Sequence, residues 1–113
     1  MTVDLEGRVI RGVDIANQAF RNKWKGLPGV IQDEAIKAIQ ETIGKSKDQL
    51  PNRLHFHSLK DKMVPSRLDA TKKVAAWSMH ITSNDAYKAS FTYEDGTLYF
   101  RTCGAHDTVD KSP

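Results

Sequence analysis

The chain lacks the features that mark membrane-spanning and disulfide-stabilised proteins. Its 113 residues include one cysteine, Cys103, so no disulfide can form within the chain. No run approaches the roughly 18 consecutive apolar residues that a membrane span needs. Residues 1–6 provide neither a basic start nor an apolar block, so we expect no secretory signal. These absences favour a cytoplasmic protein and argue against a membrane partner.

Common metal-binding motifs, repeats and low-complexity tracts are also missing. The chain contains no Cys-x-x-Cys and no His-Glu-x-x-His spacing. With 39% hydrophobic and 27% charged residues, its composition is that of an ordinary globular protein. The length suits one hydrophobic core and is too short for two. We therefore expect a single domain over residues 1–113.

Positive charge is concentrated in one stretch rather than spread along the chain. The formal net charge is only +3, but residues 51–75 hold six basic and two acidic residues, a local net charge of +4. A phosphate backbone would be attracted to such a stretch, and a solvated loop would have the same composition. The basic residues are Arg53, Lys60, Lys62, Arg67, Lys72 and Lys73.

Apolar residues at helical spacing predict two helices in the first half. The first covers residues 14–25, with Asp14 as its N-cap. The second begins at Pro28, which suits a first helical turn, and ends at Gly44. Before them, residues 8–13 predict a short edge strand. The two helices should form a hairpin.

Beyond residue 53 the apolar period changes from helical to two, which predicts strands. The alternating segments are 54–57, 75–82, 87–93 and 98–101, and the Asp95-Gly96 pair between the last two indicates a hairpin turn. Residues 59–74 are expected to form a longer loop. The fold class is therefore α+β: two helices packed on one face of an antiparallel sheet of about four strands, with the opposite face left for function.

Every histidine of the chain lies in this strand region. Period two places His55 and His57 on one side of a strand and His80 on the polar side of the next. His106 ends the last strand beside Asp107. Four groups that titrate near neutral pH suggest acid–base chemistry on a phosphate, although any single histidine could be a structural hydrogen-bonding residue.

Two other site chemistries fit the same residues less well. His-x-His with a third histidine could hold zinc, with Cys103 or Asp107 as a further ligand, but no metal motif supports it. Cys103 could act as a nucleophile, but a strand cysteine is usually buried and inert. Trp77 alternates with core positions and should pack in the core, whereas Tyr87 or Tyr99 could stack on bases.

The order of the chain's segments resembles the RelE/ParE toxin superfamily over about residues 8 to 110. The resemblance rests on the helical hairpin through residues 27–32 (Leu-Pro-Gly-Val-Ile-Gln), followed by Leu-His-Phe-His at 54–57, Ala-Trp-Ser-Met-His-Ile at 76–81, Tyr-Lys-Ala-Ser-Phe at 87–91, Glu-Asp-Gly-Thr at 94–97 and Arg-Thr-Cys-Gly-Ala-His-Asp at 101–107. The resemblance implies a RelE-like fold and the toxin of a type II toxin-antitoxin system. Most members are endoribonucleases that cut mRNA on the ribosome without a metal or other cofactor, and a ParE-like branch inhibits DNA gyrase.

Within that superfamily the histidine pattern is most similar to the YafQ-like mRNA interferases. The similarity implies catalytic roles for His57, His80, Asp85 and His106, with Asn84 as an alternative for the acidic position. His106 is the leading general acid or base. The implied partners are a cognate antitoxin, the ribosome and mRNA. A gyrase inhibitor and a noncatalytic or metal-binding domain of the same fold are the alternatives. RNA binding and charge stabilisation would come from Lys60, Lys62, Lys72, Lys73, Lys88 and Arg101.

Overall fold

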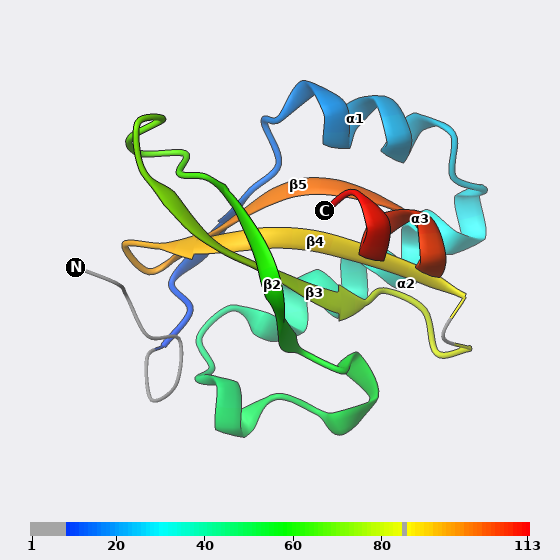
Figure 1. Ribbon diagram of the computed structural model, residues 1–113. Coiled ribbons are helices and arrows are strands. Elements are labelled where there is room, and N and C mark those ends of the chain that lie inside the picture. The colour runs from blue at the N-terminus through cyan, green and yellow to red at the C-terminus, as the bar shows by residue number, and fades with distance from the viewer. Residues whose placement is uncertain (1–8, 85) are drawn as a thin grey trace.

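A computed structural model describes residues 9–84 and 86–113 as a mixed α+β fold built on one sheet (Figure 1). The strand order is β1-β5-β4-β3-β2. None of the helices among the described residues is long and apolar enough to cross a membrane. In chain order the elements are β1 (Gly12–Asp14), α1 (Gln18–Lys25), α2 (Gly29–Thr42), the 3₁₀ turns η1 (Lys47–Gln49) and η2 (Asn52–Leu54), β2 (His57–Pro65), β3 (Lys73–His80), β4 (Tyr87–Glu94), β5 (Thr97–Ala105) and α3 (His106–Lys111).

The sheet has five strands rather than about four, and it is not purely antiparallel. Strands β2 to β5 pair antiparallel, but β1 runs parallel to β5, with Val13 opposite Leu98. The predicted edge strand exists and lies at the sheet edge, although it begins at Gly12 and spans only three residues. A strand this short has too few residues to show the direction of its pairing in the sequence.

Both predicted helices of the first half are present, with one corrected boundary. Helix α1 begins at Gln18 because the Asn17 side chain caps it, accepting hydrogen bonds from the amides of Ala19 and Phe20. Asp14, the predicted cap, lies in β1 and accepts a bond from Ala16 instead. Helix α2 follows Pro28 and ends before Gly44, whose φ of 83° suits glycine.

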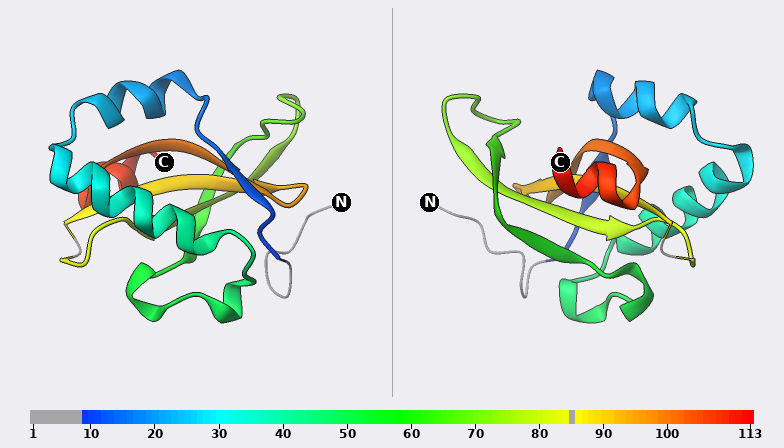
Figure 2. Two further views of the ribbon diagram at one scale, coloured as in Figure 1. Left: turned by 180° about the vertical axis from the view of Figure 1, so that it is seen from behind. Right: turned by 45° about the vertical axis from the view of Figure 1, so that its right-hand side comes forward.

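The long loop expected at residues 59–74 is mostly a hairpin, and this prediction was wrong. Strand β2 continues to Pro65 and β3 begins at Lys73, so only residues 66–72 connect them. We call this hairpin, residues 57–80, the β2–β3 arm; it curves away from the rest of the sheet (Figure 2). Pro65 is tolerated because β2 is an edge strand.

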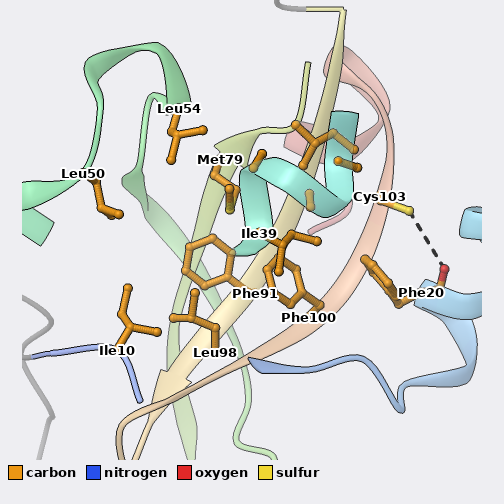
Figure 3. Packing of buried hydrophobic residues seen from close by; sticks show 14 of the residues in the cluster. Ile10, Phe20, Ile39, Leu50, Leu54, Met79, Phe91, Leu98, Phe100 and Cys103 are labelled. Atoms are coloured by element: carbon orange, nitrogen blue, oxygen red, sulfur yellow. Dashed lines mark hydrogen bonds between the residues drawn. The ribbon is translucent and has the colours of Figure 1, made fainter. Parts of the chain in front are cut away.

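A run of aromatic rings connects α1 to the sheet in the hydrophobic core (Figure 3). Phe20 lies 5.6 Å from Phe100, Phe100 lies 5.4 Å from Phe91, and Phe91 lies 4.9 Å from Phe56, measured between ring centroids. Trp77 packs against Phe56 at the edge of this core, which confirms its predicted packing role. The core is therefore formed by residues of α1 and α2 against one face of the sheet.

Cys103 belongs to the same core and is 2% exposed. Burial raises the pKa of its thiol to about 11, because a thiolate loses hydration there. Its Sγ donates only a weak bond to the carbonyl oxygen of Phe20 at 3.9 Å. The expectation of a buried strand cysteine is confirmed.

The Asp95-Gly96 turn joins β4 to β5 as predicted. Both residues have positive φ, 51° and 78°, as a tight hairpin turn requires. Arg11 fastens this turn to the β1 edge: its amide donates to the carbonyl oxygen of Gly96 and its guanidinium to that of Asp95.

Helix α3 lies on the sheet face opposite α2, as the front and rear views show (Figures 1 and 2). Helix α3 was not predicted, because six residues with one buried apolar side chain, Val109, are too few to show a helical period. The face predicted to be left open for function is thus partly covered.

Candidate functional site

Strand register gives the sheet one apolar and one polar face. Across β3 and β4, Met79 pairs with Ala89 on the core side. The alternate pairs, Ser78 with Ser90 and His80 with Lys88, must then share the opposite face. We call this opposite face the polar face.

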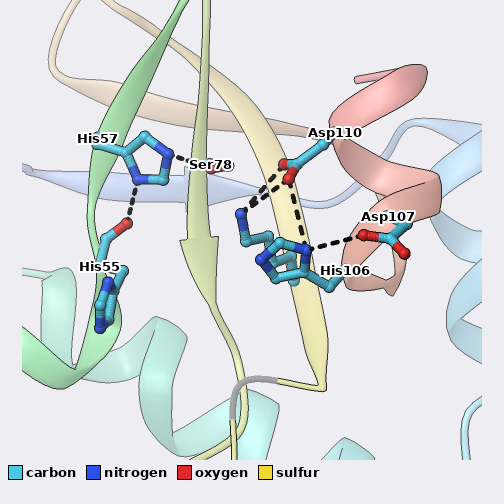
Figure 4. A network of polar contacts seen from close by, with 7 residues as sticks. His55, His57, Ser78, His106, Asp107 and Asp110 are labelled. Atoms are coloured by element: carbon cyan, nitrogen blue, oxygen red, sulfur yellow. Dashed lines mark hydrogen bonds and ion pairs between the residues drawn. The ribbon is translucent and has the colours of Figure 1, made fainter.

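The rings of His55, His80 and His106 meet at one end of the polar face, and His57 contacts the backbone of His55; Figure 4 shows His55, His57 and His106. The His55 and His80 rings are stacked, with centroids 4.4 Å apart and planes at 16°. The His106 ring meets His80 edge-on at 5.7 Å. His80 is buried, at 5% exposure, whereas His55 and His57 are exposed and His106 is intermediate. The convergence expected of at least three histidines is therefore present.

His55 reaches this cluster by a different route from the one the alternation predicted. It ends the η2 turn in a left-handed conformation, with φ of 45°, and strand β2 begins only at His57. The two histidines therefore do not share one side of a strand. A left-handed turn at a non-glycine residue leaves no mark in the apolar period.

His57 is held by both of its ring nitrogens. Its Nδ1 lies 2.6 Å from the carbonyl oxygen of His55, and its Nε2 lies 3.4 Å from the Ser78 hydroxyl. Because a carbonyl oxygen only accepts, Nδ1 must carry the proton of the neutral ring, and Nε2 accepts from Ser78. Nε2 is therefore the basic nitrogen of neutral His57.

His106 begins α3, and strand β5 ends at Ala105, which corrects the expectation that His106 ends the last strand. Its amide donates to the carbonyl oxygen of Ala86, which fixes its backbone beside β4. The carboxylates of Asp107 and Asp110 lie 3.4 and 3.5 Å from its Nδ1. Both favour a proton on that nitrogen and leave Nε2 for other chemistry.

Two cations of the predicted set lie on the polar face: Lys88 pairs with His80, and Arg101 lies further along β5, within electrostatic range of Arg67 and Glu94. The Lys88 side chain is 5% exposed, and its Nζ contacts both oxygens of Asp110 at 3.1 and 3.2 Å. Arg101 is half-buried and donates from Nε to the carbonyl oxygen of Pro113 at 3.0 Å. Burial and the nearby Arg67 lower the pKa of Arg101, and Glu94 opposes them. The guanidinium stays charged near neutral pH.

The structure does not bring Lys62, Lys72 or Lys73 to the histidines. Lys62, Lys72 and Lys73 are exposed on the β2–β3 arm. Lys73 starts the strand that His80 ends, so the two are about 23 Å apart along it. Asp85 lies outside the described residues, as does the side chain of Lys60.

The remaining candidates have structural roles. Asn84 accepts hydrogen bonds from the Thr82 hydroxyl at 2.7 Å and from the Ala86 amide at 3.2 Å, which stabilises the turn before β4. Tyr87 packs against the core, and the Tyr99 ring lies 5.6 Å from the Arg67 guanidinium. Both tyrosines are partly buried by these contacts.

Three residues of the site were not singled out from the sequence. Ser78 and Ser90 are buried on the polar face, and their alternation with core residues was the available signal. Asp110 contacts both Lys88 and His106. Its spacing of four residues from His106 is a helical signal that becomes readable only once α3 is known.

A cavity of about 240 Å³ opens beside His80, between α2 and the end of β3. Its polar lining includes Glu34, Lys37, Arg53 and Thr82. Glu34 also accepts a long bond, 3.4 Å, from the Ser83 amide at the cavity rim. The cavity thus offers both donors and acceptors next to the histidine cluster.

Among the residues that the structure describes, no group of three or more histidine, cysteine, aspartate and glutamate side chains has a geometry that could hold a metal ion. Comparisons with protein-family models, with curated proteins and with solved structures find no match to this chain.

Proposed function

We propose that this chain is an RNA endonuclease of the RelE/ParE type, the toxin of a type II toxin-antitoxin system that stops translation by cutting mRNA on the ribosome. The observation that supports this best is the gathering of all four histidines, with Lys88 and Arg101, on one polar sheet face. A cognate antitoxin would hold the toxin inactive in the cytoplasm.

RNA can be cleaved through its own 2′-hydroxyl when three requirements are met. A base removes the proton from the 2′-oxygen as it attacks phosphorus. An acid gives a proton to the departing 5′-oxygen. Cations stabilise the negative charge that builds on the phosphate. The products are a 2′,3′-cyclic phosphate and a 5′-hydroxyl, and no external water or metal is required.

The polar face offers candidates for each role. His57 and His106 each have an Nε2 not committed to a carboxylate, so one would act as base and the other as acid. His80 lies between His55 and His106 and would orient their rings or contact the phosphate. Lys88 and Arg101 would supply the stabilising charge.

The cavity beside His80 would accept a nucleobase next to the reacting phosphate. Its carboxylate and cationic lining can pair with the amino and carbonyl groups of a base edge. This arrangement would give the nuclease a base preference. The proposal requires an α+β fold with helices on one face of a sheet, and α1 and α2 contribute core residues to one face here.

The test is to add the purified chain to a translating cell-free system and map mRNA ends by primer extension. Wild type should produce cuts at ribosome-occupied codons, and His106→Ala should reduce them by about 100-fold or more, the usual contribution of a general acid or base. Thr108→Ala is the matched control, because Thr108 is exposed in the same helix and its carbonyl oxygen accepts from the Ser112 amide, a backbone bond that alanine keeps.

Two results would contradict the proposal. If mRNA stayed intact with wild type and both variants, the chain would not be a nuclease. Inhibition of purified DNA gyrase by the same wild-type preparation would then favour a ParE-like inhibitor. Equal cutting by wild type and His106→Ala would mean that the histidine cluster does not catalyse the cleavage.

A further inference from the structure

One short segment supplies the acceptors for the cations and one of the hydroxyls on the polar face. Residues 107–113, the rest of α3 and the tail after it, lie over β4 and β5 (Figures 1 and 2). Both oxygens of the Asp110 carboxylate accept hydrogen bonds from the Nζ of Lys88, at 3.1 and 3.2 Å. The Pro113 carbonyl oxygen accepts from Arg101 at 3.0 Å and from Ser90 at 3.3 Å.

These acceptors resemble the oxygens of a nucleic-acid backbone in their chemistry. A carboxylate that binds a lysine through two oxygens presents the same charge and acceptor pattern as a phosphate. A carbonyl oxygen shared by a guanidinium and a serine hydroxyl fills a second acceptor position. Lys88 and Ser90 are 4% and 0% exposed, so no external anion can reach them while the segment stays in place.

Displacing the segment would leave the His106 backbone in place but would remove the contacts of Asp107 and Asp110 with the Nδ1 of His106. The His106 backbone is fixed by its amide bond to Ala86, before the segment begins. Helix α3, which starts at His106, is only six residues long, has no side-chain cap at its N-terminus and buries one apolar side chain, Val109. A helix this short holds together mainly through its docking contacts.

We propose that residues 107–113 form a strap that occupies the anion site of the polar face, and that a single-stranded RNA phosphodiester binds Lys88, Arg101 and Ser90 only by displacing it. The choice of RNA as ligand rests on the proposed function. The apparent affinity for RNA is then the affinity of the undocked molecule multiplied by the fraction of molecules in which the strap is undocked. It would also keep the cations from binding other anions.

Asp110→Asn and Asp107→Asn provide a matched test. Both remove one negative charge from the same helix, but Asp107 is exposed and contacts His106 only, whereas Asp110 holds Lys88. The probe is a fluorescein-labelled, 2′-O-methyl single-stranded RNA, which cannot be cleaved, titrated by fluorescence polarisation. If about nine molecules in ten have the strap docked, Asp110→Asn should bind about tenfold tighter than wild type, and Asp107→Asn within about twofold.

Val109→Ala tests the strap without changing charge. It removes the buried side chain that anchors α3, so it should also tighten RNA binding, by about threefold or more. It keeps the proposal testable if Asp110→Asn fails to fold, which circular dichroism would reveal.

Three results would overturn the strap. Equal tightening by both aspartate variants would mean that only overall charge matters. Weaker binding by Asp110→Asn would mean that Asp110 positions Lys88 for the ligand. No binding by any variant would mean that the face is not an anion site. If the variants bind RNA as predicted but wild type never cuts mRNA, the strap proposal stands and the nuclease proposal is wrong. The two proposals can therefore fail separately.

Discussion

Glu94 fastens the β2–β3 arm to the end of β4, and its replacement by glutamine tests how that arm is held. The side chain is 6% exposed. It accepts hydrogen bonds from the Ser66 hydroxyl, from the Arg67 amide at 2.9 Å and from the Thr92 hydroxyl at 2.8 Å. Ser66 in turn accepts from the amides of Leu68 and Asp69, so the carboxylate organises the loop that joins β2 to β3.

The size of the effect follows from what glutamine keeps and loses. Glutamine retains one acceptor oxygen and the shape of the side chain, but it loses the negative charge that strengthens all three bonds. Hydrogen bonds to a charged group contribute about 1.5 to 3 kcal/mol each, and neutral ones about 1. We therefore expect Glu94→Gln to lower the free energy of unfolding at pH 7 by about 2 kcal/mol, and the melting temperature by about 10 °C.

The pH dependence gives the sign of the effect. Burial raises the pKa of Glu94, but the bonds from Ser66, Arg67 and Thr92 outweigh it, so the pKa lies below its usual 4.5. The unfolded chain then binds more protons than the folded one in acid. The stability from this carboxylate is complete above about pH 4.5 and is lost as pH falls through the lowered folded-state pKa.

The assay is urea unfolding of wild type, Glu94→Gln and the control Glu41→Gln, from pH 7 down to pH 3. Glu41 pairs with Arg53 at the surface, so its replacement should cost less than about 1 kcal/mol. The gap between wild type and Glu94→Gln should narrow as pH falls. Equal costs for the two variants, or a gap that widens in acid, would refute this account of the arm.

Three further predictions concern the core and the β4–β5 turn. Phe100→Ala should lower the free energy of unfolding by about 3 to 5 kcal/mol in urea, because the ring is fully buried between Phe20 and Phe91; a cost below about 1 kcal/mol would contradict this packing. Gly96→Ala should cost about 1 to 2 kcal/mol in the same assay, because φ is 78° and a Cβ would meet the Arg11 guanidinium at 2.2 Å; unchanged stability would show that the turn differs. Cys103, with its pKa raised to about 11, should react with iodoacetamide at pH 8 far more slowly in the folded chain than in urea, as mass spectrometry would show; equal rates would mean that the thiol is exposed.

The parts of the fold that the sequence predicted are those with a repeated local signal. Helix α2 carries an apolar stripe over four turns between Pro28 and Gly44. The β4–β5 hairpin combines alternation with Asp95-Gly96, a pair that accepts positive φ. In both cases the local conformational preference and the tertiary packing agree, so the sequence pattern was sufficient to predict the element.

The errors arise where a long-range contact decided the structure. Strand β2 contains the charged residues 60–62 in place of alternation, and pairing with β3 makes it a strand. Helix α3 is stabilised by Val109 and by the Asp110 contact with Lys88, a partner 22 residues away. Neither contact can be read from local periodicity.

The candidate site was predicted better in its residues than in its geometry. The histidines do meet, but His55 reaches His80 through a left-handed turn and His106 through the start of a helix. The sequence predicted the same RNA-binding role for every lysine of the candidate set. The fold separates them, since Lys88 lies beside the histidines and Lys73 lies at the far end of the arm.

The most direct test of the central claim is the chemistry of the RNA ends that the chain produces. Fragments from the translating cell-free system would be treated with and without a phosphatase that opens and removes cyclic phosphates, then ligated and sequenced. Cleavage by the histidines of the polar face should leave 2′,3′-cyclic phosphate and 5′-hydroxyl ends, because the attacking group is the neighbouring 2′-oxygen. Ends with a 3′-hydroxyl and a 5′-phosphate, or mRNA that stays intact, would contradict it.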